Sequence, residues 1–249
     1  MKLTIAVSPW RVTRFLIVVV LCLLILSVVG QFTLYFLPDF PGRDGIVEEF
    51  NIDAEGNFPS MYSALTLLLC SILLAIIAQA KKVEGNRYAF HWKLLAFIFL
   101  YLCLDEGLSL HEHVITPLRK LGFSGFLYHA WVVPAALILP IIGLLFLRFL
   151  FSLPSKTRRL FIIACCLFIG GAMGMEVIGG NHADLYGEDN LNYEIIVTIE
   201  EFLEMLGIIV FLHSLLSYMN RFQIRDFGIR VQVNTNKAAS RLGSKEQSL

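Results

Sequence analysis

The chain has 249 residues and equal numbers of acidic and basic side chains, 20 of each, so its formal net charge is zero. Hydrophobic residues make up 57% of it, charged residues only 16%, and the mean hydropathy is +0.70. These values exclude an ordinary soluble globular protein. No basic patch with interleaved aromatic residues is present, so nucleic acid is not an expected partner.

Six apolar stretches are each long enough to cross a hydrocarbon core of roughly 30 Å, which takes about 20 residues of helix. They span residues 14–37, 58–80, 88–111, 127–150, 160–180 and 194–218. The first stretch is too long for a secretion signal and no small-residue cleavage site follows it, so we expect a retained anchor. The predicted fold is all-α: a six-helix transmembrane bundle over residues 14–219 with short loops.

Basic residues indicate the orientation of this bundle. Of the 20 Lys and Arg residues, 17 lie in the N-terminal segment (residues 1–13), at alternate connections and span ends, or in the tail. The positive-inside rule therefore predicts that both termini are cytoplasmic, which agrees with an even number of spans. The tail, residues 220–249, is polar and basic, and we expect it to be disordered near the anionic inner leaflet.

The first outer connection, residues 38–57, is acidic and contains Pro and Gly, which predicts a loop with a short strand at residues 45–52. Asn57 followed by Pro59 predicts the cap and first turn of the second helix. All five cysteines fall inside predicted spans, which argues against a disulfide framework or a thiolate zinc site. Trp92 and Trp131 fall near predicted membrane interfaces, as residues of an aromatic belt do.

Acidic residues inside the spans are the unusual feature, because each costs about 2.5–3.5 kcal/mol at the centre of a membrane helix. From the rise of a helix, Asp105 lies about 18 Å along the third span and Glu176 about 25 Å along the fifth, both counted from the cytoplasm. Glu204 lies about 15 Å below the outer end of the sixth. Three helices therefore deliver acids to the outer half of the bilayer.

The predicted directions of these side chains around each helix axis also bring them together. On a continuous helix, Asp105 and Glu112 share one arc, and Gly170 and Gly174 form a GxxxG pair that lets other helices approach the fifth span. His129 and His182 can join from the outer rim. The candidate cluster comprises Asp105, Glu106, Glu112, His113, Glu176, Glu201 and Glu204.

Because the sequence places no Lys or Arg among these acids, either several carry protons or a cation lies among them. Carboxylates with one or two imidazoles suit Mn, Fe, Ca or Mg. The first hypothesis is a site for such a divalent metal, with the seven residues as ligands, in an enzyme that acts on a lipid or a periplasmic substrate. The stretch from His111 lacks the second His of an HExxH zinc motif.

Two other functions are compatible with the same residues. A proton- or cation-coupled transporter is one, since acids inside a membrane mark ion paths and LDE at residue 104 and IEE at residue 199 hint at an inverted repeat. The inner halves of the spans offer no comparable polar path, which favours a site open only to the outside. A membrane assembly or scaffold protein, as a homo-oligomer or in a larger complex, is the other.

Three motifs also carry a resemblance. LDE-x4-HE in the third span, GME-x2-GG in the fifth and EEFLEMLG in the sixth resemble a group of bacterial multi-span proteins without an assigned activity. The resemblance covers most of the membrane part and implies a multi-pass protein of the bacterial inner (plasma) membrane. It implies no particular catalytic residues.

Overall fold

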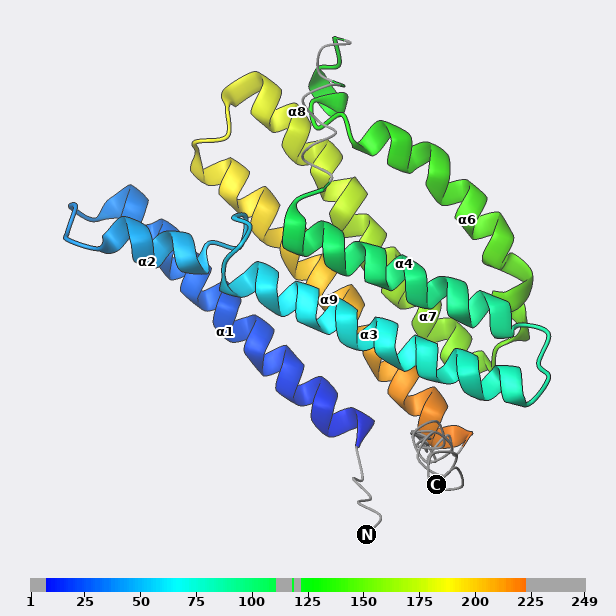
Figure 1. The fold of residues 1–249 in the computed structure, drawn as a ribbon. Coiled ribbons are helices and arrows are strands. Elements are labelled where there is room, and N and C mark those ends of the chain that lie inside the picture. The colour runs from blue at the N-terminus through cyan, green and yellow to red at the C-terminus, as the bar shows by residue number, and fades with distance from the viewer. Residues whose placement is uncertain (1–7, 111–117, 119–121, 223–249) are drawn as a thin grey trace, which may run out of the picture.

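The computed structural model describes residues 8–110, 118 and 122–222, and over these residues all regular structure is helical (Figure 1). This confirms the predicted all-α class for the described part of the chain. The elements are α1 (Pro9–Phe36), α2 (Arg43–Phe50), α3 (Phe58–Val83), α4 (Ala89–Leu108), the 3-10 turn η1 (Gly125–Leu127), α6 (Val132–Ser152), α7 (Ser155–Ile169), the π-helix η2 (Gly170–Met175), α8 (Glu176–Tyr186) and α9 (Leu191–Arg221).

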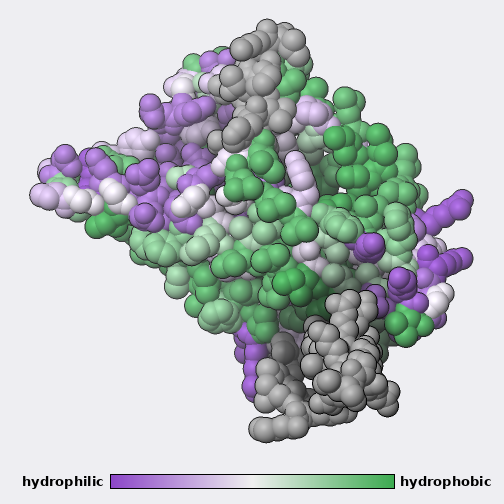
Figure 2. All heavy atoms as spheres, in the orientation of Figure 1, coloured by the Kyte–Doolittle hydropathy of each residue, from purple (hydrophilic) through white to green (hydrophobic). Residues whose placement is uncertain are grey.

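Each of the six predicted stretches contains a helix. Four segments are long and apolar enough to cross a membrane: α1, α3, α6 and the continuous run α7–η2–α8, Ser155–Tyr186. The other two predicted stretches hold α4, with 20 residues, and α9, with 31. Figure 2 shows apolar side chains filling the middle of the visible face, with polar side chains gathered toward two ends. A protein with several membrane-spanning helices follows, whereas the number of spans and their orientation stay predictions.

Helix α9 is the centre of the bundle and contacts α1, α3, α7, η2 and α8 (Figure 1). Helices α3 and α4 pair along their length after a tight turn at Gly85, whose φ of +67° suits glycine. Helix α6 lies at the edge, and its buried residues are Val132 in its first turn and Phe149 near its end. The middle of α6 is therefore the most exposed apolar part of the bundle.

Aromatic side chains fill the core at the end of the bundle where α3 ends and α4 begins. Trp92 is only 1% exposed. Its ring centre lies 5.0 Å from that of Phe149, 6.0 Å from that of Phe161 and 4.9 Å from that of Tyr218. Trp92 is therefore a core residue, because its ring packs against side chains of α6, α7 and α9 instead of facing outward.

The first outer connection is a helix rather than the expected strand. Gly42, with φ +85°, precedes α2, and Val47 of α2 packs against Gly30 of α1. Val47 is the buried residue of α2, and its contact with Gly30 holds this helix against α1. The prediction for α3 is confirmed, since Asn57 caps it in a reciprocal capping box with Ser60.

Candidate functional site

A π-helix positions the first acid of the site. Six residues of η2 interrupt the run from α7 to α8, and Glu176 follows as the first residue of α8. A wider turn of this kind rotates the next residues relative to the helix before them and is frequent at functional sites. Glu176 thereby faces both α9 and the segment before α6.

Close helix packing makes the approach of α9 possible. A Cβ atom placed on Gly171 would lie 2.7 Å from the carbonyl oxygen of Glu200 and 2.8 Å from Cγ of Glu204. Only glycine fits at that distance, so the two backbones approach more closely than any side chain permits. The expected pair Gly170 and Gly174 makes no such contact, because the π-helix turns both away from α9.

Glu176 is the best-connected acid of the site. The indole Nε1 of Trp131 donates a hydrogen bond of 2.6 Å to Glu176 Oε1, and His129 Nδ1 lies 3.1 Å from the same oxygen. The carboxyl groups of Glu176 and Glu200 lie within hydrogen-bonding reach of each other. Glu200 is itself buried, with 7% of its surface exposed. Residues from α8, α9 and the start of α6 thus form one polar group.

His129 connects this group to the outer loops. Its backbone and ring pack on Gly180 of α8, where a Cβ would lie 3.4 Å from the His129 nitrogen. The Gly125 N–H donates to Asp184 Oδ2 at 2.8 Å and holds the same loop on α8. The other ring nitrogen of His129, Nε2, lies 3.8 Å from Oε1 of the half-exposed Glu188. An acid–imidazole–acid series therefore leads from the surface to Glu176.

The remaining described acids lie next to this group. Glu204 interacts electrostatically with Asp105, Glu106 and Glu176. Glu201 does so with Glu204, Glu106 and Glu176, and also with Asp53 of the first outer connection. Acids from α4, α8 and α9 therefore face a common region.

The structure changes one step of the sequence argument. Helix α4 ends at Leu108, and Ser109 follows in the left-handed conformation with φ +52°. The helix predicted to run to residue 111 therefore ends at Leu108, and the shared face predicted for Asp105 and Glu112 stays a prediction. Glu112 and His113 lie outside the described residues. Within the described part of the chain, no three His, Cys, Asp or Glu side chains are arranged to hold a metal ion.

Trp131 and Glu200, which contact Glu176, and Glu188, which lies next to His129, were not among the seven residues of the predicted cluster. Trp131 was expected only near a membrane interface. The spacing of His129 and Trp131 at the outer start of an apolar stretch is a usable signal, since both side chains present N–H groups. His182, expected at the rim, instead lies 2.8 Å from Asn190 Oδ1 in the turn before α9.

This fold and site define a helical membrane protein with an interhelical carboxyl–histidine cluster. Residues 16–219 match the family described as Domain of unknown function (DUF8692), and the chain belongs to that family. Comparison with curated proteins and with solved structures gives no match.

Proposed function

We propose that the chain is a multi-pass protein of a bacterial inner membrane, with both termini cytoplasmic, and that it carries an acid–base site in the outer half of the bilayer. Its substrate is a membrane lipid or a molecule of the outer compartment. The observation that carries this proposal is that the carboxyl groups of Glu176 and Glu200 lie within hydrogen-bonding reach of each other, while Trp131 donates to Glu176.

Two carboxyl groups hydrogen-bond to each other only when they share at least one proton. Trp131 and His129 both present ring nitrogens to Glu176 Oε1, and N–H donors stabilise an ionised carboxylate. We therefore assign the shared proton to Glu200 and the negative charge to Glu176. Such a pair offers a general acid and a general base to one substrate, as paired carboxyl groups in unrelated enzymes do.

The packing of α9 supports a site that opens to one side. Below Glu204, α9 contributes Met205, Ile209, Leu212 and Leu215 to the apolar core, each at most 1% exposed. A proton-coupled transporter requires a polar path through that core, so we place the transporter second to the enzyme. Lipid is the substrate class that reaches such a site directly from the bilayer.

A divalent cation is the second candidate for the acids nearest α4. The proximity of Asp105 and Glu106 to Glu204 supports it, and oxygen ligands suit Mn, Fe, Ca or Mg. The described residues alone do not form a metal-ligand set, so this candidate requires Glu112 or His113 as a further ligand. Elemental analysis of the purified protein, of Asp105→Asn and of Glu201→Gln tests it by loss of a stoichiometric metal.

Infrared spectroscopy tests the shared proton. For the protein in phospholipid at neutral pH, we expect a protonated-carboxyl C=O band that disappears in Glu200→Gln and persists in Glu49→Gln, a change of an exposed acid on α2. No such band, or an equal band in Glu200→Gln, would contradict the proposal.

Lipid products test the catalytic part. We expect vesicles of phosphatidylethanolamine and phosphatidylglycerol to show a new lipid product by mass spectrometry with wild type and not with Glu176→Gln. A pH-dependent ion flux without a product would favour the transporter. Neither activity, in a protein that still shows the band, would leave a scaffold in which neutral acids join helices.

A further inference from the structure

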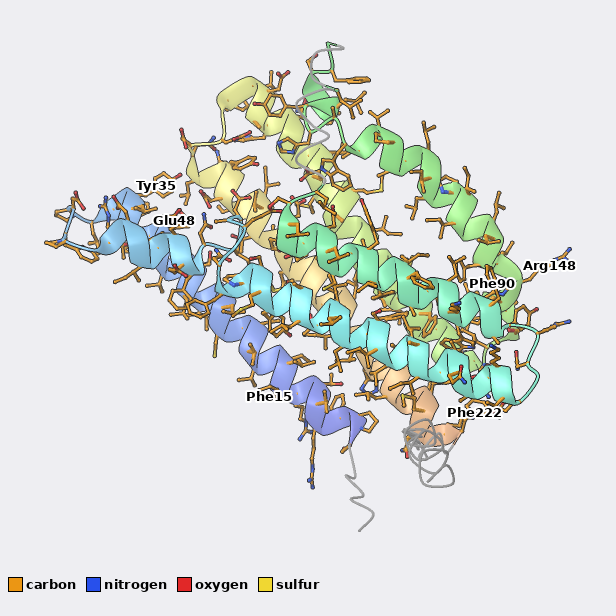
Figure 3. The ribbon with its side chains drawn as sticks, in the orientation of Figure 1. Phe15, Tyr35, Glu48, Phe90, Arg148 and Phe222 are labelled. Atoms are coloured by element: carbon orange, nitrogen blue, oxygen red, sulfur yellow. The ribbon has the colours of Figure 1, made fainter. Side chains whose placement is uncertain are left out.

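A second polar feature lies at the opposite end of the bundle from the acid site. There a cavity of about 160 Å³ is bounded by the turn between α3 and α4, the turn between α6 and α7, and the end of α9. Figure 3 shows Phe90, Arg148 and Phe222 at this end, away from Tyr35 and Glu48. Lys81, Asn86, Tyr88, Trp92, Ser152 and Phe222 are among its lining residues.

Lys81 is the unusual residue of this cavity, because its side chain is only 5% exposed. Its ammonium nitrogen lies 2.7 Å from Oε2 of Glu84, 4.6 Å from the ring centre of Phe222 and 5.8 Å from that of Tyr218. An ammonium group has three N–H donors, and buried charges normally have several hydrogen-bond partners. Glu84 supplies one oxygen, and its own side chain is half exposed.

The walls of the cavity combine two chemistries. Lys81, Asn86 and Ser152 are polar, whereas Trp92 and Phe222 are aromatic. The adjoining turn also carries the exposed base Arg87. A ligand that fits both the polar and the aromatic walls has an anionic head group joined to an apolar body. Basic pockets between membrane helices bind the head groups of anionic lipids.

We propose that this cavity, the Lys81 pocket, binds the phosphate of an anionic phospholipid. The lysine ammonium contacts the phosphate oxygens, and the first carbons of the lipid lie against the aromatic wall. A free phosphate ester shares the charged contact but not the apolar one, so the two ligands can be separated. The proposal is independent of the acid site and of which leaflet the pocket faces.

Native mass spectrometry of the full chain, purified in detergent and titrated with phosphatidylglycerol, tests this pocket. We expect one tightly retained lipid in wild type and a loss of affinity of about ten- to a hundredfold in Lys81→Met, as expected for losing a charged hydrogen bond. Lys81→Arg should keep most of the binding. Lys82→Met is the matched control, since Lys82 is exposed and does not line the pocket, and it should stay within about twofold of wild type.

A second variant covers the case in which Lys81→Met does not fold. Ser152→Phe fills the pocket from α6 while keeping Lys81 and Glu84, and it should also lose the lipid. Equal lipid retention in wild type and Ser152→Phe would overturn the proposal, as would equal loss in Lys81→Met and Lys82→Met. Inorganic phosphate that displaces the lipid at the same concentration as a competing phospholipid would also overturn it, because the apolar wall would then contribute nothing.

Discussion

The two halves of α9 differ in the kind of side chain that they contribute to the bundle. Its N-terminal half carries Glu200, Glu201 and Glu204 near acids on α4 and α8. Its other half, from Met205 to Tyr218, packs against aromatic and aliphatic side chains in the main core. Both halves need a close helix contact: Gly171 meets α9 near Glu200, and Gly207 meets α7 near Phe168.

This contrast separates stability from chemistry. In the apolar half, the helices are joined mainly by packing of apolar side chains, with a contact of 2.8 Å between Thr13 Oγ1 and His213 Nδ1. In the acidic half, helix packing also buries carboxyl groups, which costs free energy. Each buried carboxyl group must therefore accept hydrogen bonds or carry a proton. We therefore expect substitutions in the apolar half to reduce stability and those in the acidic half to change hydrogen bonding and function more than stability.

The largest effect should come from Trp92→Ala. Removing the buried indole leaves a cavity among Phe149, Phe161 and Tyr218, and we expect a loss of about 3–5 kcal/mol in unfolding free energy. Thermal unfolding in detergent, followed by circular dichroism, measures it. Trp10→Ala, at a ring that is 54% exposed, is the control and should cost far less. Similar losses in both would show that the aromatic core does not dominate stability.

Trp131→Phe should have the next largest effect, because it removes the N–H donor from Glu176 while keeping an aromatic ring. We expect a loss of about 1.5–3 kcal/mol, the range for a hydrogen bond to a charged group. The protonated-carboxyl band attributed to Glu200 should also shift. An unchanged spectrum together with unchanged stability would show that the indole serves only as a membrane-interface anchor.

Gly171→Ala should cost about 1–3 kcal/mol, because the added methyl group must push α9 away from η2. Gly107→Ala on α4 is the matched control, since a Cβ there meets nothing within 4 Å. We expect the control to be neutral or slightly stabilising, given the better helix propensity of alanine. If both variants unfold at the same temperature, the close contact between η2 and α9 is absent in solution.

The smallest effect should come from Asn57→Ala, which removes the cap of α3. Asn57 accepts from the Ser60 N–H and donates to the carbonyls of Glu48 and Asn51. We expect a loss of about 0.5–2 kcal/mol, with proteolysis of the first outer connection becoming faster. Asn57→Asp keeps the accepting oxygen and should recover part of the stability, unless the cap contributes little and α2 is held mainly through Val47.

Sequence patterns predicted the helices well, because a run of twenty apolar residues favours a long helix and cap residues act through local contacts. They failed where contacts with another helix decided the outcome. Val47 of the segment 43–50 packs on α1, and Trp92 is buried because side chains of α6, α7 and α9 surround it. Helix α4 ends before the predicted residue 111 because Ser109 adopts a left-handed turn, which periodicity alone does not reveal.

The arrangement of the acid site likewise depends partly on the sequence pattern and partly on contacts between helices. Charge and spacing in the chain predict acids at a similar depth on three helices, since depth is calculated from a constant rise per residue. Which acid meets which donor depends on helix rotation and on backbone distance, both set by the π-helix at η2 and by the glycine contact at Gly171. Pairing of Glu176 with Glu200, Trp131 and His129 is thus a property of the packed bundle, because these residues lie far apart along the chain and meet only after the helices dock.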